Sequence, residues 1–233
     1  MHNLEKEINS FSHLWKGGFR NGLSINQEAD SVCDYKMLYQ KIIQPYISKN
    51  KRCLEIGCGN GFWSEVLVGF GEYVAFDALS AGHNKFWNRI KKEDWISYFQ
   101  VKDFRCDELE DNSIDYVFSY DVFCHISYSG AQEYLKNLSS KLKNGADLFI
   151  MIADEAKYKD DVGLRKLMEH AGHKDLGSFM SDIDGDSSKT PGRWFFYGAE
   201  KFINFARKCG YTLVDKDAAL NIDKLSPVIH LKK

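Results

Sequence analysis

Short apolar runs alternate with amphipathic segments over most of the chain. Runs of five to nine residues that are mostly apolar predict strands, and segments whose apolar positions recur every three or four residues predict helices. The predicted strands cover residues 53–57, 73–78, 97–104, 114–121, 146–154, 211–218 and 227–233. The predicted helices cover residues 31–47, 62–70, 81–92, 129–143, 160–171 and 199–210. Strands alternating with helices indicate an α/β protein with a doubly wound, mostly parallel, Rossmann-like sheet.

Local signals set some of these boundaries. Ser129 followed by Gln132 resembles a capping box, which predicts that a helix begins there. Gly145 is typical of a helix C-cap and predicts that this helix ends just after Lys143. The following run, 146–154, is apolar at nearly every position, which predicts a strand buried on both faces.

The length and composition indicate one domain with a sizeable core. The chain has 233 residues, 44% of them hydrophobic, with a formal net charge of −2. We interpret residues 1–48 as an N-terminal helical arm or lid, and residues 155–197 as an insertion that contributes to a substrate site. A basic face, usual for nucleic-acid binders, is not indicated. The polar N-terminus, the lack of a long apolar window and six scattered cysteines without a C-x-x-C pair favour a cytoplasmic protein without a membrane partner.

Three glycines follow the first predicted strand in "LEIGCGNGFW". Gly57, Gly59 and Gly61 allow a tight strand-to-helix turn and let a ligand approach the backbone closely. Asp77 ends the second predicted strand, where an acid can accept hydrogen bonds from both ribose hydroxyls. Together these residues predict a site for an adenosine-type ligand at the carboxyl edge of the sheet.

The glycine spacing differs from that of dinucleotide-binding proteins. In G-x-G-x-x-G the third glycine lies five positions after the first, whereas here Gly61 comes early. Glu55 would repel a pyrophosphate but suits a ligand with a cationic amino or sulfonium end. An NAD-dependent oxidoreductase is therefore the weaker interpretation, and a catalytically silent binding module is another alternative.

From about Lys51 to its end, the chain resembles the class I S-adenosylmethionine-dependent methyltransferases. The resemblance lies in an ordered series of motifs: "LEIGCGNG", "AFDA", "VKDF", "SIDYVFSYDVFCHI" and "YLKNLSSKLKNGADLFI". Asn144-Gly145-Ala146 stands where the family usually has Pro-Gly-Gly. The resemblance implies seven strands, mostly parallel, that end in an antiparallel hairpin.

The resemblance also implies how S-adenosylmethionine is bound. Glu55 would lie near its amino group, Asp77 would hold the ribose diol, and the backbone near Tyr120 would receive the amino end. Asp103 would hydrogen-bond the adenine amino group, with Phe104 beside the ring. The full set of implied cofactor-binding residues is Trp15, Glu55, Gly57, Cys58, Gly59, Gly61, Asp77, Ala78, Asp103, Phe104 and Tyr120.

Three segments supply candidate residues for catalysis and substrate binding. His125 follows the fourth strand and is the candidate general base, and Asp121, four residues earlier, would orient it if that turn is helical. A packed histidine without a proton role is the alternative. Asp154 ends the fifth strand as a candidate substrate ligand, and Arg193 beside Trp194 would clamp an anionic substrate.

No metal site is expected. The stretch "DIDGD" (182–186) resembles part of a calcium loop, but the position that requires a bidentate Glu holds Arg193. We expect a small-molecule methyltransferase, O-methylating a sugar or a phosphorylated or nucleotide-linked precursor of a surface polysaccharide. N-methylation of a small amine is the alternative within the family, and a homodimer is a further expectation.

Overall fold

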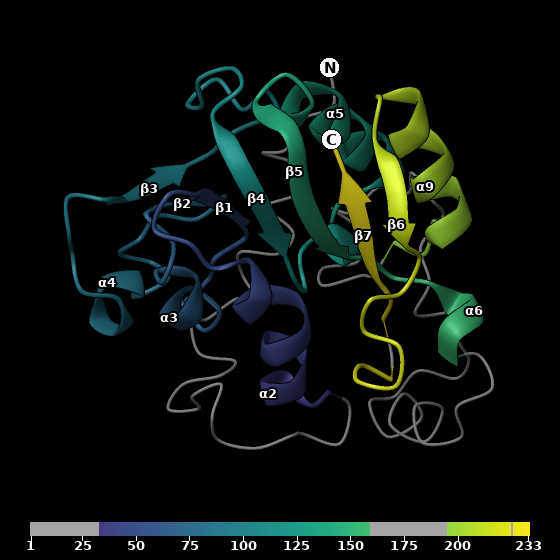
Figure 1. Ribbon diagram of the computed structural model, residues 1–233, viewed down its shortest axis with the longest axis horizontal. Coiled ribbons are helices and arrows are strands. Elements are labelled where there is room, and N and C mark those ends of the chain that lie inside the picture. The colour runs from purple at the N-terminus through teal and green to yellow at the C-terminus, as the bar shows by residue number, and fades with distance from the viewer. Residues whose placement is uncertain (1–32, 159–194, 225) are drawn as a thin grey trace.

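A seven-stranded mixed sheet forms the centre of the computed structural model, which describes residues 33–158, 195–224 and 226–233 (Figure 1). The strands lie in the order β3-β2-β1-β4-β5-β7-β6. Parallel pairs join β1 to β2, β1 to β4, β2 to β3 and β4 to β5, whereas β7 is antiparallel to both β5 and β6. The strands are β1 Arg52–Ile56, β2 Glu72–Asp77, β3 Ile96–Gln100, β4 Ile114–Ser119, β5 Leu142–Met151, β6 Thr212–Asp215 and β7 Val228–Lys232. The predicted fold class is confirmed.

Helices cover both faces of the sheet, and the period-two alternation of each strand divides the core between them. Apolar residues of α5 and α9 pack on one face, and those of α2, η1, α3 and α4 pack on the other. The bounds are α2 Tyr35–Leu38, η1 Tyr39–Ile43, η2 Gln44–Tyr46, α3 Ser64–Leu67, α4 Phe86–Arg89, η3 Phe123–His125, α5 Tyr128–Leu138, α6 Glu155–Tyr158 and α9 Ala199–Lys208. No helix in the described ranges is long and apolar enough to cross a membrane.

The predicted boundaries of α5 and β5 are wrong. Ser127, not Ser129, caps α5, because its hydroxyl accepts a hydrogen bond from the Gly130 amide at 3.2 Å. The helix ends at Leu138 rather than near residue 143. Gly145 lies inside β5 with a φ of 84°, and its amide binds the carbonyl of Lys233. Pairing with distant backbone therefore converts the predicted end of a helix into the beginning of a strand.

The strand order places a topological switch point between β1 and β4. The chain runs outward from β1 to β2 and β3, and then crosses back to β4 on the other side of β1. In open α/β sheets ligands bind at the carboxyl ends of the strands at such a point. The loops after β1, β2 and β4 meet at this edge.

Candidate active site

The loop after β1 holds three glycines in left-handed conformations. Gly57, Gly59 and Gly61 have φ values of 77°, 51° and 87°. A Cβ atom on Gly57 would lie 2.1 Å from Cγ2 of Val122, which follows β4. Backbone conformation and the close approach of a neighbouring loop thus both require glycine at this position.

Asp77 joins this loop to the end of β2. One carboxylate oxygen accepts the Gly59 amide and the other accepts the Leu79 amide, each at 2.8 Å. The residue is 8% exposed, and burial raises the pKa of its carboxyl above the ordinary value while the hydrogen bonds oppose that rise. The predicted ribose-binding acid and the glycine loop are therefore in direct contact.

Glu55 lies one strand away, beneath α3. It shares a face of β1 with Cys53, and its carboxylate accepts hydrogen bonds from Ser64 at 2.6 Å and from the Tyr73 hydroxyl. Only 2% of the residue is exposed, and burial raises the pKa of its carboxyl to about 7. The structure shows Glu55 bound to these two hydroxyls, and its predicted position near a cofactor amino group stays a prediction.

Asn60 is a polar group of the glycine loop that sequence reasoning missed. The residue is 7% exposed, and its side-chain nitrogen has no hydrogen-bond partner among the residues that the structure describes. A buried donor of this kind is costly unless a ligand or water satisfies it. The sequence signal that could have identified Asn60 is its position between Gly59 and Gly61 in the loop.

These features fit S-adenosylmethionine. The side-chain nitrogen of Asn60, without a partner in the described part of the chain, suits the carboxylate of its methionyl end, and the Asp77 carboxylate suits a ribose diol. The partly exposed Ala78 follows Asp77, and the buried Cys58 places its sulfur 3.9 Å from that carboxylate.

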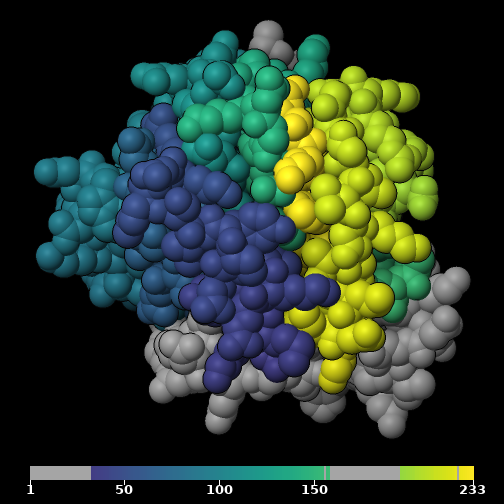
Figure 2. All heavy atoms as spheres, in the orientation of Figure 1, coloured from purple at the N-terminus to yellow at the C-terminus, as the bar shows by residue number. Residues whose placement is uncertain are grey.

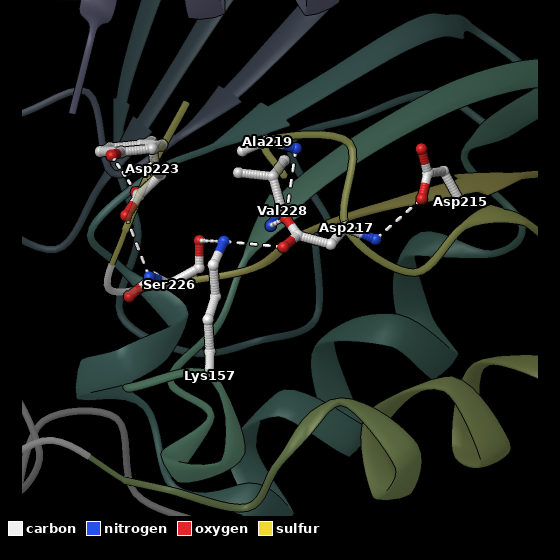
Figure 3. A network of polar contacts seen from close by, with 8 residues as sticks. Lys157, Asp215, Asp217, Ala219, Asp223, Ser226 and Val228 are labelled. Atoms are coloured by element: carbon white, nitrogen blue, oxygen red, sulfur yellow. Dashed lines mark hydrogen bonds and ion pairs between the residues drawn. The ribbon is translucent and has the colours of Figure 1, made fainter. Parts of the chain in front are cut away.

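After β4, Tyr120 is tied to the linker between β6 and β7. Its hydroxyl donates to the buried Asp223, whose other oxygen accepts the Ser226 amide at 3.0 Å (Figure 3). In the same linker the carbonyl of Ile222 accepts the Asp34 amide at 3.2 Å. Figure 2 shows the segment that begins at Cys33 packed against this C-terminal part of the chain.

Lys157 anchors α6 to the same linker. Its ammonium lies 2.7 Å from a carboxylate oxygen of Asp217 and 3.0 Å from the Ser226 carbonyl (Figure 3). Asp217 also accepts the amides of Ala219 and Val228. The linker, residues 216–227 with residue 225 left out of the description, thus connects Tyr120, the start of α2 and α6.

The two candidate catalytic residues lie at the same edge, but not on one helical turn. Asp121 is left-handed, with a φ of 59°, and its amide contacts the sulfur of Met151 at 3.0 Å. The 3₁₀ turn η3 begins only at Phe123, so the helical spacing expected to bring Asp121 beside His125 is wrong. Both side chains are partly exposed at the edge, and their catalytic roles stay predictions.

Asp154 has a structural role that the sequence did not indicate. One carboxylate oxygen accepts the Ala156 amide at the start of α6, and the other accepts the Ala199 amide at the start of α9, each at 2.9 Å. The carboxylate predicted as a substrate ligand therefore joins the two segments that flank residues 159–194.

The two residues predicted to contact adenine, Asp103 and Phe104, lie beyond the end of β3. Strand β3 ends at Gln100, so Asp103 and Phe104 lie in the loop after it, and Asp103 pairs with Arg105 at 2.9 Å. Phe104 is fully buried against Tyr134 and has no exposed face on which a ligand ring can stack. The role predicted for Phe104 is therefore corrected to that of a core residue.

Three predicted site residues cannot be placed. Trp15, Arg193 and Trp194 lie outside the described residues, as does the 182–186 stretch. Among the residues that are described, no group of three or more His, Cys, Asp or Glu side chains is arranged to hold a metal ion.

A glycine loop, an acid at the end of β2 and a switch point between β1 and β4 define an α/β protein that binds a nucleoside-containing cofactor. The chain belongs to a methyltransferase-domain family, which matches residues 31–215. Family and fold together confirm the expectation of an S-adenosylmethionine-dependent methyltransferase. We find no match among curated proteins.

Several solved methyltransferases share the fold. A putative S-adenosylmethionine-dependent methyltransferase from Listeria monocytogenes is 14% identical, with a TM-score of 0.57 over 85% of this chain and 97% of that one. An S-adenosylmethionine-dependent methyltransferase from Mesorhizobium loti is 12% identical, with a TM-score of 0.60 over 88% and 99%. The N-methyltransferase NodS from Bradyrhizobium japonicum, in complex with S-adenosyl-L-homocysteine, is 14% identical, with a TM-score of 0.60 over 98% of both chains.

Proposed function

We propose that the protein methylates a hydroxyl group of a small molecule, a sugar in a phosphorylated or nucleotide-linked precursor of a surface polysaccharide. The observation that carries the choice of a hydroxyl is the position of His125, partly exposed on the turn directly after β4, at the carboxyl edge where Asp77 and the glycine loop meet. A hydroxyl acceptor benefits from a base, and an imidazole is the side chain best suited to that role near neutral pH.

In this proposal the chain binds and orients, and removes one proton. Bound S-adenosylmethionine supplies a methyl group activated by its sulfonium sulfur. Asp77 accepts hydrogen bonds from the ribose hydroxyls, and Asn60 donates to the methionyl carboxylate. His125 accepts the proton of the acceptor hydroxyl, with Asp121 as its neighbour at the same edge.

The test is transfer of labelled methyl groups from S-adenosylmethionine to a cell metabolite extract, followed by NMR of the labelled product. An O-methyl signal on a sugar is the expected result. An N-methyl signal, or transfer to nucleic acid or protein alone, would contradict the proposal. His125→Asn should lose methyl transfer by about a hundred-fold or more while keeping the wild-type affinity for S-adenosylhomocysteine.

N-methylation of a small amine is the second candidate. Asp121 adds a partly exposed carboxylate at the edge, which suits a cationic acceptor, and the similar NodS is an N-methyltransferase. Transfer to an amine has less need of a base. Retention of methyl transfer by His125→Asn, together with an N-methyl product, would favour this candidate.

A further inference from the structure

We propose that the indole N–H of Trp63 is a second hydrogen-bond donor, beside Asn60, to the methionyl carboxylate of S-adenosylmethionine. The inference rests on the cofactor orientation used in the proposed function, with the ribose at Asp77. It concerns a residue just after the glycine loop for which the sequence predicted no role.

Trp63 carries a buried donor that the described part of the chain leaves unsatisfied. The residue is 4% exposed, and no described residue accepts a hydrogen bond from its indole nitrogen. A buried tryptophan N–H usually finds an acceptor, because an unsatisfied one is costly. Asn60, three residues earlier, has the same unsatisfied donor in its side-chain nitrogen. Two such donors at the end of one loop indicate a ligand that brings acceptor oxygens to it.

Four aromatic rings hold the indole in place. Its ring centroid lies 5.2 Å from that of Phe118 and 5.3 Å from that of Tyr120. On its other contacts, the rings of Tyr35 and Phe62 meet it edge to face at 5.8 Å and 5.4 Å. A ring packed in this way keeps its N–H in one direction and does not turn it out to solvent. The donor is therefore satisfied only by an acceptor that comes to it.

The indole lies on the side of the glycine loop toward which the cofactor extends. The strand order places β1 between β2 and β4, so Asp77 and Tyr120 lie on opposite sides of the glycine loop. Two strand spacings, about 10 Å, separate β2 from β4. A cofactor with its ribose at Asp77 that enters the switch point between β1 and β4 directs its methionyl end toward Tyr120. Trp63 contacts the Tyr120 ring on that side.

The chemistry of the two donors selects one group of the cofactor. An indole nitrogen and a side-chain amide nitrogen donate hydrogen bonds and accept none. The methionyl end offers a sulfonium, an ammonium and a carboxylate, and of these only the carboxylate accepts hydrogen bonds. Its two oxygens allow Asn60 and Trp63 each to donate to the same group.

The test compares S-adenosylhomocysteine with its decarboxylated analogue, which keeps the adenosine, the sulfur and the amine. Dissociation constants of both ligands are measured by calorimetry for the wild type and for Trp63→Phe, which keeps an aromatic ring but lacks the N–H. Losing a hydrogen bond to a charged group weakens binding by about 10- to 100-fold. We therefore expect Trp63→Phe to reduce the preference for S-adenosylhomocysteine over the analogue by about 10- to 100-fold. Loss of packing around the smaller ring affects both ligands alike and leaves this preference unchanged.

Trp95→Phe is the matched control. Trp95 is half-buried and directly precedes β3, and its carbonyl accepts the Tyr73 amide at 3.0 Å near the start of β2. It therefore lies at the amino edge of the sheet, opposite the proposed site. Its substitution should leave the preference between the two ligands within about two-fold of wild type.

A measurement on the wild type does not depend on the folding of any variant. The chain has five tryptophans, whose indole N–H groups give separate NMR signals after isotope labelling. One of these signals should move downfield when S-adenosylhomocysteine is added and stay in place with the decarboxylated analogue. In Trp63→Phe that signal should be missing.

The outcomes separate this inference from the proposed function. Absence of S-adenosylhomocysteine binding by the wild type would overturn both. The methyl acceptor enters neither measurement, so a failure of hydroxyl methylation would leave this inference standing. Wild-type binding with an unchanged ligand preference in Trp63→Phe, with an equal change in Trp95→Phe, or with no indole signal that distinguishes the two ligands would overturn this inference alone.

Discussion

The buried carboxylate of Glu55 should make the protein less stable as the pH rises, because the pKa of this carboxyl is higher in the folded state. Burial raises the pKa of this carboxyl from 4.5 to about 7, against the effect of its hydrogen bonds with Ser64 and Tyr73. An acid whose pKa is higher in the folded state binds its proton more tightly there. Its stabilising contribution is therefore complete below about pH 4.5 and is lost as the pH rises through about 7.

The magnitude follows from the difference in pKa. At about 1.4 kcal/mol per pH unit, a rise from 4.5 to about 7 corresponds to about 3 kcal/mol, most of which is lost between pH 5 and pH 8. Because Glu55 is 2% exposed, solvent screening reduces this value little. Glu55→Gln keeps the shape and an acceptor oxygen but cannot ionise, so it removes the pH-dependent loss.

The assay is urea unfolding of the ligand-free wild type and of Glu55→Gln between pH 5 and pH 8. We expect the variant to gain about 2–3 kcal/mol relative to wild type across this range. Glu72→Gln is the matched control, since this side chain is 63% exposed beside Arg52 and should produce no comparable trend. A difference between Glu55→Gln and wild type that stays constant with pH would refute the reasoning.

Other substitutions test the geometry of the edge, each by urea unfolding. Gly57→Ala should lower the free energy of unfolding by several kcal/mol, because its Cβ would collide with Val122. Gly145→Ala should lower it by only about 1 kcal/mol, because its φ is left-handed but nothing lies within 4 Å of its Cβ. Equal losses for the two variants would contradict the predicted collision with Val122. Asp154→Ala should lose about 1–2 kcal/mol with its two amide contacts, and an unchanged stability would remove its role at α6 and α9. Lys157→Met should cost about 2 kcal/mol, because it leaves a largely buried carboxylate unpaired, and a stabilised variant would contradict this.

The sequence pattern was sufficient to predict those parts of the site that are formed by residues close together in the chain. The turn of glycines and the acid that ends β2 are set by backbone freedom and by adjacent residues, so their contact could be predicted from the sequence. The mostly parallel sheet with an antiparallel C-terminal hairpin was expected from the alternation of elements and from the resemblance to a family. The predicted helix end at Gly145 was wrong because the amide of Gly145 pairs with the carbonyl of the distant Lys233 in the sheet, and no local sequence signal indicates that pairing.

The hydrogen-bond partners of buried polar side chains also could not be predicted from the sequence pattern. The alternation of β1 places Glu55 on the face under α3, where its carboxylate accepts from hydroxyls nine and eighteen residues away, and no sequence motif indicated these two partners. Asp154 was expected to bind substrate, but its oxygens cap two helices, one of them 45 residues further along the chain. The hydrogen bond that the Asn84 side chain donates to the Tyr98 hydroxyl joins a turn to a strand, and only the paired sheet brings these two residues together.

The single carboxylate of Asp154 also bears on how such a protein diversifies. Because it accepts the amides of both Ala156 and Ala199, this one side chain joins the start of α6 to the start of α9. The entropy of closing a loop changes only slowly with its length. A change of length between residues 158 and 195 is therefore expected to cost the sheet little, provided that the Lys157 ion pair and the buried side chains of Phe195 and Tyr197 are kept.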